Sequence, residues 1–186
     1  MTNHYDVIIA GGGAAGLYAA LNLPASLRVL LICKRELTLC NSALAQGGIA
    51  GVYDSPEDDV QLHKQDTLVA GGFKNNTETL SILVNEAAQD IGRIIDLGVE
   101  FDRNPDGSLE GGHSKHRIFH HKDATGFEIV SKLLQTVRTL PNVEILENTL
   151  LCGVAKTGTG FSVDTLHEGT YTAFHSHFLL LATGGI

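Results

Sequence analysis

DVIIAGGGAAGLYAAL, residues Asp6–Leu21, is the stretch that decides the fold. It begins with an apolar run, passes through three consecutive glycines and continues with apolar residues at helical spacing up to Pro24, which ends the pattern. A short apolar run that stops at glycines is typical of a buried parallel strand. A second such run, Leu27–Cys33, follows the helical segment. The sequence therefore predicts a βαβ unit with a right-handed crossover.

The glycines between the first strand and the helix match the spacing GxGxxG at Gly11, Gly13 and Gly16. The first glycine permits a tight turn, the second lets the backbone approach a pyrophosphate, and the third lets helix and strand pack closely. Amides at the start of the helix then face the anion. We expect a dinucleotide site made by Gly11, Gly12, Gly13, Ala14, Ala15 and Gly16, with a purely structural glycine turn as the alternative.

The end of the second strand does not identify the dinucleotide. The dinucleotide-binding pattern places an acidic residue there to hold the ribose hydroxyls, but this chain has Lys34 and Arg35, with Glu36 two residues late. Basic residues at this point suit the 2′-phosphate of NADP, and they are equally typical of a solvated strand end. Both interpretations stay open on spacing alone.

Three further helices are predicted. The first begins in SPEDDVQLHKQDTLVAGG, residues 55–72, where Ser55 can be the N-cap, Pro56 the first helical residue, and Asp58 at N3 completes a capping-box pattern. The strongest helix covers Thr77–Leu97, with Gly98 at its C-terminus. Another is predicted over residues 126–139, before Pro141. The apolar stripe of the strongest helix comprises Leu80, Leu83, Val84, Ala87, Ile91, Ile94 and Ile95.

From Val143 onward the pattern changes to short strands, VEIL, LLCGVAK, FSVDTL, YTAFH and HFLLLA, which favours a meander or hairpins. The last segment, FLLLATGGI, predicts a buried strand that opens into a glycine turn. Since a domain seldom ends at such a turn, we expect a truncated chain. The fold class that follows is α/β, with a parallel sheet, helices and an added antiparallel β-meander.

Composition limits the function classes. The 186 residues carry a net charge of −8, which disfavours binding to nucleic acid or to an anionic membrane. Three cysteines without a CxxC motif indicate neither a disulfide framework nor a structural zinc site. No signal-peptide pattern and no apolar run of transmembrane length is present. We expect a cytoplasmic protein.

The loop SLEGGHSKHRIFHHKDATG, Ser108–Gly126, concentrates four histidines, several basic side chains and the carboxylate of Glu110. It could be a metal site, an anion cradle or a polar loop. The spacing His-x₂-His-x₃-His-His fits no structural zinc pattern, so we predict no metal here.

Several separate segments resemble the succinate dehydrogenase/fumarate reductase flavoprotein superfamily: Asp6–Leu21, Asn41–Val52 (NSALAQGGIAGV), Asp66–Gly72 (DTLVAGG) and the terminal ATGG. That superfamily commonly has a lysine where Lys34 stands. The resemblance implies a Rossmann-like FAD-binding fold, with residues 1–186 as the N-terminal portion of the FAD-binding domain and the capping and C-terminal domains absent. Beyond the glycine turn, it implies FAD contacts from Lys34, Asn41, Ser42, Ala43, Leu44, Ala45, Gln46, Gly47 and Gly48.

Within that superfamily, EGGHSKHRIFHHKDATG most resembles the L-aspartate oxidases. Eleven positions fit: Glu110, Gly111, Gly112, His113, Ser114, Arg117, Ile118, His120, Asp123, Thr125 and Gly126. Five differ from the commonest forms: Leu109, Lys115, His116, His121 and Lys122. The resemblance implies that Glu110 orients the α-ammonium group of the substrate and that His113, Ser114 and His120 line or brace the flavin pocket. His116 and His121 are expected to be solvated, and Arg117 could hold either the loop or a substrate carboxylate.

The reaction implied by the resemblance is oxidation of L-aspartate to iminoaspartate, with hydride transfer to FAD and reoxidation by oxygen or fumarate, for quinolinate and NAD biosynthesis. Quinolinate synthase is then a candidate partner. Because residues 35–46 contain no histidine, we expect FAD to be non-covalent. The implied catalytic arginine and further substrate-binding residues have no counterpart here, so these 186 residues are expected to be inactive alone. The alternatives are a succinate/fumarate-type oxidoreductase and a non-catalytic nucleotide-binding module.

Overall fold

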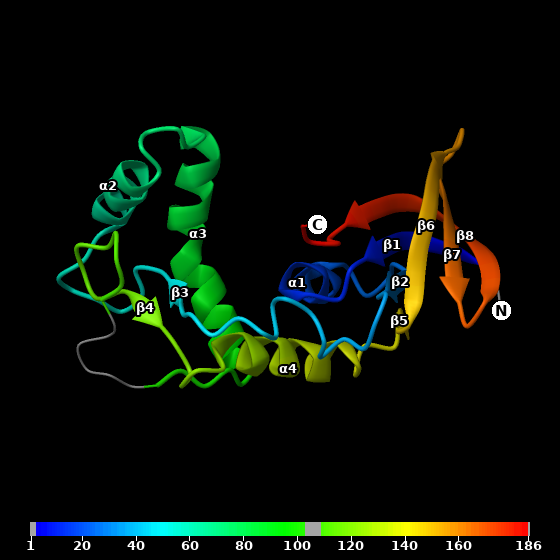
Figure 1. Cartoon of the computed structure of the whole chain (residues 1–186), viewed down its shortest axis with the longest axis horizontal. Helices are drawn as coiled ribbons and strands as arrows, with labels where there is room; N and C mark the ends of the chain where they lie inside the picture. The colour runs from blue at the N-terminus through cyan, green and yellow to red at the C-terminus, as the bar shows by residue number, and fades with distance from the viewer. Residues whose placement is uncertain (1–2, 103–108, 186) are drawn as a thin grey trace. The chain divides into compact units, whose positions relative to one another are not determined.

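The computed structural model describes residues 3–102 and 109–185 (Figure 1). Ser108 and Ile186, which belong to segments quoted above, lie outside these residues. The chain divides into two compact units, one formed by Met1–Ala45 with Ile129–Ile186 and the other by Gln46–Glu128. We call them the sheet unit and the helical unit and describe each by itself.

The sheet unit is built on one six-stranded sheet, in the order β5-β2-β1-β8-β7-β6. Strands β5, β2, β1 and β8 are mutually parallel, whereas β6, β7 and β8 form an antiparallel meander. The strands are β1 (His4–Ala10), β2 (Val29–Ile32), β5 (Val143–Leu146), β6 (Thr149–Lys156), β7 (Phe161–His167) and β8 (Thr170–Leu181). Helix α1 (Ala14–Asn22) connects β1 to β2. The predicted βαβ unit and the α/β fold class are therefore confirmed.

Two strand predictions at the C-terminal end are corrected. Val143–Leu146, expected among the meander strands, instead pairs parallel with β2 at the edge of the sheet. The segments YTAFH and HFLLLA form the single strand β8, because no turn residue separates them and Ser176 pairs with Phe161 on one side and Tyr5 on the other.

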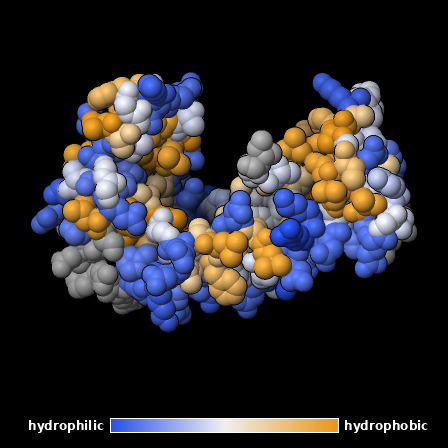
Figure 2. All heavy atoms as spheres, in the orientation of Figure 1, coloured by the Kyte–Doolittle hydropathy of each residue, from blue (hydrophilic) through white to orange (hydrophobic). Residues whose placement is uncertain are grey.

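Strand β8 was also expected to be buried, but Phe178 is 66% exposed and Leu181 is 60% exposed. Residues 170–176 of β8 pair with β7 and residues 175–181 pair with β1. In the second part Leu179 packs against the core, whereas Phe178 and Leu181 are exposed. Figure 2 shows apolar side chains at the surface over β6 and β8. The apolar run therefore predicted the strand correctly and the burial of Phe178 and Leu181 wrongly.

The helical unit contains α2 (Val60–Ala70), α3 (Thr77–Asp96) and a two-residue pairing of β3 (Ile49–Ala50) with β4 (Ile118–Phe119). The predicted helix over residues 77–97 is confirmed: the side chain of Asn76 accepts from the Thr79 amide, and Gly98 has φ of 92°. The buried stripe is narrower than expected. Leu83 is 65% exposed, because burial follows Leu80, Val84, Ile91 and Ile94 and leaves Leu83 at the edge of the stripe.

The predicted start of α2 at Ser55 is wrong. The N-cap is Asp59, whose carboxylate accepts a hydrogen bond from the Leu62 amide at 2.8 Å. Asp58 was expected to complete a capping box, but both of its oxygens bind Arg117. Helix α4 (Thr125–Val137) agrees with the helix expected over residues 126–139.

Candidate functional site

In the sheet unit, the turn between β1 and α1 can be built only from glycine at two positions. Gly11 has φ of +119°, and a Cβ there would lie 2.1 Å from the carbonyl oxygen of Ala182. A Cβ on Gly16 would lie 1.9 Å from the carbonyl oxygen of Gly11. The turn therefore contacts Ala182, directly after β8, on one side and the start of its own helix on the other.

The start of α1 is a suitable place for an anion. Gly13 is the N-cap and supplies no side-chain hydrogen bond, and the first turn of α1 carries no acidic residue. The Ala14 amide donates to the hydroxyl oxygen of Ser42 at 3.1 Å, and a Cβ on Gly13 would lie 3.0 Å from that same oxygen. The structure thus brings two predicted FAD-binding segments together, the glycine turn and Asn41–Ala45. Amides at a helix N-terminus, with the dipole behind them, are a phosphate-binding arrangement.

The remaining predicted cofactor residues of the sheet unit differ in exposure. Gly12 is buried, and a Cβ there would lie 1.9 Å from Cδ2 of Leu37. Ala43 is buried as well, so only its backbone is available to a ligand. The exposed residues are Ala15, Lys34, Asn41, Leu44 and Ala45.

In the helical unit, the predicted residues Gln46, Gly47 and Gly48 lead into β3. Gln46 and Gly47 are exposed. A Cβ on Gly48 would lie 2.4 Å from Cγ2 of Ile118 and 2.6 Å from the carbonyl oxygen of Phe119. The structure therefore places this segment against β4, which belongs to the histidine-rich loop. The pairing of β4 in that loop with β3 was not predicted.

A buried ionic cluster underlies the histidine-rich loop. We call Asp58, Asp66, His113, Ser114 and Arg117 the Arg117 cluster. The Arg117 side chain is fully buried. Its Nε and Nη2 donate to the two oxygens of Asp58, each at 2.7 Å, and its Nη1 donates to Oδ2 of Asp66 at 2.6 Å. Of the two roles left open by the sequence, these contacts assign Arg117 to holding the loop.

Asp66 joins the loop to α2. Its Oδ2 accepts from the Ser114 amide at 2.9 Å, from the Ser114 hydroxyl at 2.8 Å and from Arg117. Burial alone would raise the pKa of Asp66, but the hydrogen bonds from Ser114 and Arg117 outweigh it and lower the pKa to about 2. Sequence reasoning did not identify Asp58 or Asp66 as partners of Arg117. The available signal was general: a buried arginine needs carboxylates.

The two histidines of the cluster region have defined chemistry. Nη1 of Arg117 lies 3.3 Å from Nδ1 of His113. Since a guanidinium can only donate, that nitrogen accepts, and the ring proton of neutral His113 is on Nε2. The His63 ring lies 5.6 Å from the His113 ring, and its Nδ1 is buried without a hydrogen-bond partner among the described residues. Burial lowers the pKa of His63, and the positive charge of Arg117 lowers it further.

Glu110 lies at the start of a tight turn. The His113 amide donates to the Glu110 carbonyl at 3.2 Å, and Gly112 has φ of +88°. These features are those of a type II turn, which requires a positive φ at its third residue. The Glu110 side chain is exposed, and its carboxylate makes no hydrogen bond or ion pair within residues 3–102 and 109–185. A carboxylate so placed can accept hydrogen bonds from an ammonium group.

The end of the loop is held separately from the Arg117 cluster. His120 lies 3.3 Å from Oδ2 of Asp102, and Nδ1 of His121 lies 2.7 Å from the carbonyl oxygen of Glu100. Because a carbonyl only accepts, Nδ1 of His121 carries a proton. His121, expected to be solvated, is thus half-buried and bonded to the backbone, while His116 is exposed.

Comparison with a protein-family model identifies the chain. The model described as "FAD binding domain" matches residues 6–186. The chain belongs to the FAD binding domain family. FAD is therefore its cofactor.

Relatives of this FAD-binding chain include L-aspartate oxidases. It is 38% identical to that of Clostridium perfringens over 185 residues, which cover 97% of the chain and 42% of the relative. It is 42% identical to that of Synechocystis over 189 residues, which cover 98% of the chain and 34% of the relative. The chain thus spans about two fifths or less of these relatives.

Solved structures support the same superfamily. The Sdh1 complex of Mycobacterium smegmatis matches with a TM-score of 0.90 and 27% identity, over 98% of this FAD-binding chain and 34% of that one. The quinol fumarate reductase FrdA of E. coli matches with a TM-score of 0.89 and 24% identity, over 98% of the chain and 33% of that one, which shows the fold. The expected superfamily and its FAD-binding fold are confirmed.

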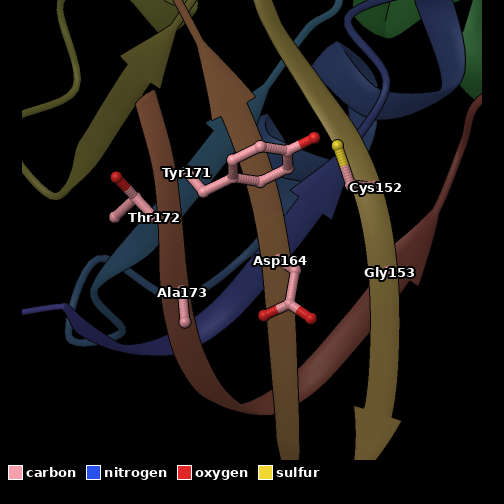
Figure 3. Close-up of a pocket in the computed structure, with 6 residues that line it drawn as sticks. All are labelled: Cys152, Gly153, Asp164, Tyr171, Thr172 and Ala173. Carbon is pink, nitrogen blue, oxygen red and sulfur yellow. The ribbon is translucent and has the colours of Figure 1, made fainter. Parts of the chain in front are cut away.

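Other features of the FAD-binding chain lie apart from these motifs. A shallow hollow of about 410 Å³ on the meander is lined by Cys152, Gly153, Asp164, Tyr171, Thr172 and Ala173. In Figure 3 the Tyr171 ring extends across β7 toward Cys152. None of the predicted site residues lines this hollow. Among the described residues there is no group of three or more histidine, cysteine or acidic side chains able to hold a metal, and no helix long and apolar enough to cross a membrane.

The Arg117 cluster should make the FAD-binding chain sensitive to strong acid. The folded-state pKa of Asp66, about 2, lies below its ordinary value of 3.8. Its stabilising contribution is therefore complete above about pH 4 and is lost as pH falls toward 2. We expect the urea midpoint of the wild type to fall over that window and the midpoint of Asp66→Asn to fall less. Ser114→Ala, which removes one donor and keeps the carboxylate, should be intermediate. If the urea midpoint fell equally with pH in all three proteins, Asp66 would not be the source of the acid sensitivity.

Proposed function

We propose that the chain is the N-terminal, FAD-binding part of an L-aspartate oxidase, which oxidises L-aspartate to iminoaspartate with oxygen or fumarate as electron acceptor. The observation that carries the proposal is the exposed carboxylate of Glu110, at the start of a turn tied to a buried ionic cluster. It is supported by 38–42% identity to L-aspartate oxidases over nearly the whole chain.

The chain's own residues then bind and orient. Bound FAD supplies the two-electron oxidation. In this proposal the amides at the start of α1, together with Ser42, bind its pyrophosphate, and Lys34, which is exposed after β2, contacts its nucleotide portion. Glu110 accepts charge-assisted hydrogen bonds from the substrate's α-ammonium group and so favours an amino dicarboxylate. FAD is held non-covalently in this proposal, because residues 35–46 contain no histidine to attach it.

Two further proposals concern the surroundings of the reaction. Its product, iminoaspartate, is unstable as an imine and suits direct use by quinolinate synthase in NAD biosynthesis. We place the protein in the cytoplasm, in keeping with its net charge of −8 and its three free cysteines.

A succinate- or fumarate-type oxidoreductase is the second candidate, since the Sdh1 complex matches with a TM-score of 0.90. A dicarboxylate without an amino group has no use for a carboxylate partner at Glu110. A non-catalytic nucleotide-binding module, the third candidate, would need neither Glu110 nor the cluster beneath it. The substrate dependence of a Glu110 variant therefore separates all three.

We expect Glu110→Gln to lower kcat/KM for L-aspartate by about 10- to 100-fold, because a hydrogen bond to a charged group contributes about 1.5–3 kcal/mol. Steady-state kinetics of the FAD-loaded full-length protein checks this. Fumarate reduction should change less than about twofold, since that substrate has no ammonium group.

The matched control is Glu86→Gln, which removes an exposed carboxylate from α3 in the same unit and should leave both activities unchanged. Equal losses with aspartate and fumarate in Glu110→Gln would favour the succinate/fumarate reading. Absence of any aspartate-dependent flavin reduction in the wild type would leave the nucleotide-binding module.

A further inference from the structure

We propose that Asp66 is a positioning residue for Glu110: by binding Ser114 and Arg117 it fixes the turn that presents the Glu110 carboxylate to the substrate ammonium group. This inference rests on the proposed role of Glu110 and adds a residue on α2 that acts through it. Asp66 itself touches no substrate in this account.

One carboxylate oxygen connects helix α2 to the turn. Oδ2 of Asp66 accepts both the amide and the hydroxyl of Ser114, at 2.9 and 2.8 Å. Two donors from one residue to one carboxylate oxygen define the orientation of that residue's backbone as well as its position. Since Asp66 lies within the regular helix α2, the anchor is attached to a rigid element.

Asp66, the anchor of the turn, is itself held rigidly by the buried Arg117. Nη1 of Arg117 donates to the same oxygen at 2.6 Å, and its Nε and Nη2 are held by Asp58. The side chains of Arg117 and Asp58 are 0% and 1% exposed, and that of Asp66 is 13% exposed. Charge-assisted bonds excluded from water are strong and geometrically specific. Asp66 is thus fixed by Arg117 as well as by its position in helix α2.

Ser114 and His113 connect Asp66 to Glu110. Ser114 directly follows His113, which closes the turn through its bond to the Glu110 carbonyl. Nδ1 of His113 also accepts from Arg117 at 3.3 Å. The carboxylate of Glu110 has no hydrogen-bond partner of its own within the described ranges, so its direction is inherited from a turn that the Arg117 cluster holds at one end.

A double-mutant cycle in the FAD-loaded full-length protein tests the inference. Asp66→Asn alone should lower kcat/KM for L-aspartate on the order of 10- to 100-fold, mainly through a higher KM, because misplacing an orienting group by about 1 Å has effects of that size. In the Glu110→Gln background the same change should have less than a twofold effect, since the group it positions is gone. Full additivity of the two substitutions would overturn the proposal.

Amide hydrogen exchange supplies a readout that does not depend on activity. The Ser114 amide should exchange on the order of tenfold faster in Asp66→Asn, whereas amides of α3 should not change. Asp59→Asn is the matched control: it makes the same Asp-to-Asn change at the N-cap of the same helix, where the amide oxygen can still accept from Leu62, and it does not touch the loop, so Ser114 exchange and KM should stay at wild-type values. Unchanged exchange at Ser114 in Asp66→Asn would overturn the proposed anchor.

The outcomes separate this inference from the proposed function. If Glu110→Gln has wild-type kinetics, both fail. If Glu110→Gln is impaired but the cycle is additive, only the positioning role of Asp66 fails. Should Asp66→Asn not fold, Ser114→Ala removes one of the two Ser114 bonds and should show the same coupling to Glu110 on a smaller scale, with additivity again counting against the proposal.

Discussion

Replacing Arg117 by methionine is expected to lower the free energy of unfolding of the helical unit by about 3–5 kcal/mol, the cost of leaving a buried ionic partner uncompensated. Two carboxylates lose their shared cation: Asp58, which is 1% exposed, and Asp66, which is 13% exposed. A whole domain is stable by only about 5–15 kcal/mol, so this loss would unfold much of the protein at moderate urea concentration. Urea denaturation followed by circular dichroism measures it.

The matched control is Arg93→Met, in the same unit. Arg93 forms an exposed pair with Asp90 at 3.3 Å, with both side chains more than 40% accessible. Such a pair contributes about 0–1 kcal/mol, so the control should stay within about 0.5 kcal/mol of the wild type. Adding Asp58→Asn to Arg117→Met should recover part of the loss, because one of the uncompensated charges is then removed. Equal stability of the two arginine variants would show that the buried pairs are not a major source of stability.

Replacing Gly16 by alanine is expected to destabilise the sheet unit by about 3 kcal/mol or more and to abolish FAD retention, since overpacking in a closely packed site costs about 1–3 kcal/mol and backbone strain adds to it. The new Cβ would lie 1.9 Å from the carbonyl oxygen of Gly11, which is backbone and cannot rotate away. To relieve that contact α1 must move from β1, and its amides then leave the phosphate position. Thermal unfolding and flavin absorbance of the purified protein test both parts.

Gly158→Ala is the control for that substitution. Gly158 also lies in the sheet unit, it has no positive φ, and nothing lies within 4 Å of the position its Cβ would take. Alanine there should be neutral or stabilise by up to about 1 kcal/mol, through the lower entropy of the unfolded chain. A Gly16→Ala protein that binds FAD and melts as the wild type does would contradict the close packing of turn and helix.

Local patterns were sufficient for much of the secondary structure. The apolar run before Gly11, the helical spacing after it and the second apolar run predicted β1, α1 and β2, because strand and helix periodicities are contained within a few residues. The helix over residues 77–97 was predicted for the same reason. The start of α2 was wrong because the carboxylate of Asp58 is engaged by a residue 59 positions away.

The sequence motifs also indicated a FAD-binding family and pointed to Glu110. They could do so because the glycine turn and the loop are each one continuous stretch of sequence. Only the tertiary structure decided what holds that loop. Ser42 binds the start of α1 from 28 positions away, and Asp66 binds Arg117 across 51 positions. It also decided that Phe178 and Leu181 of β8 are exposed. The physical reason is common to these cases: backbone periodicity and glycine geometry are local properties, whereas the partner of a buried charge and the cover of a strand face depend on which distant segments the fold brings together.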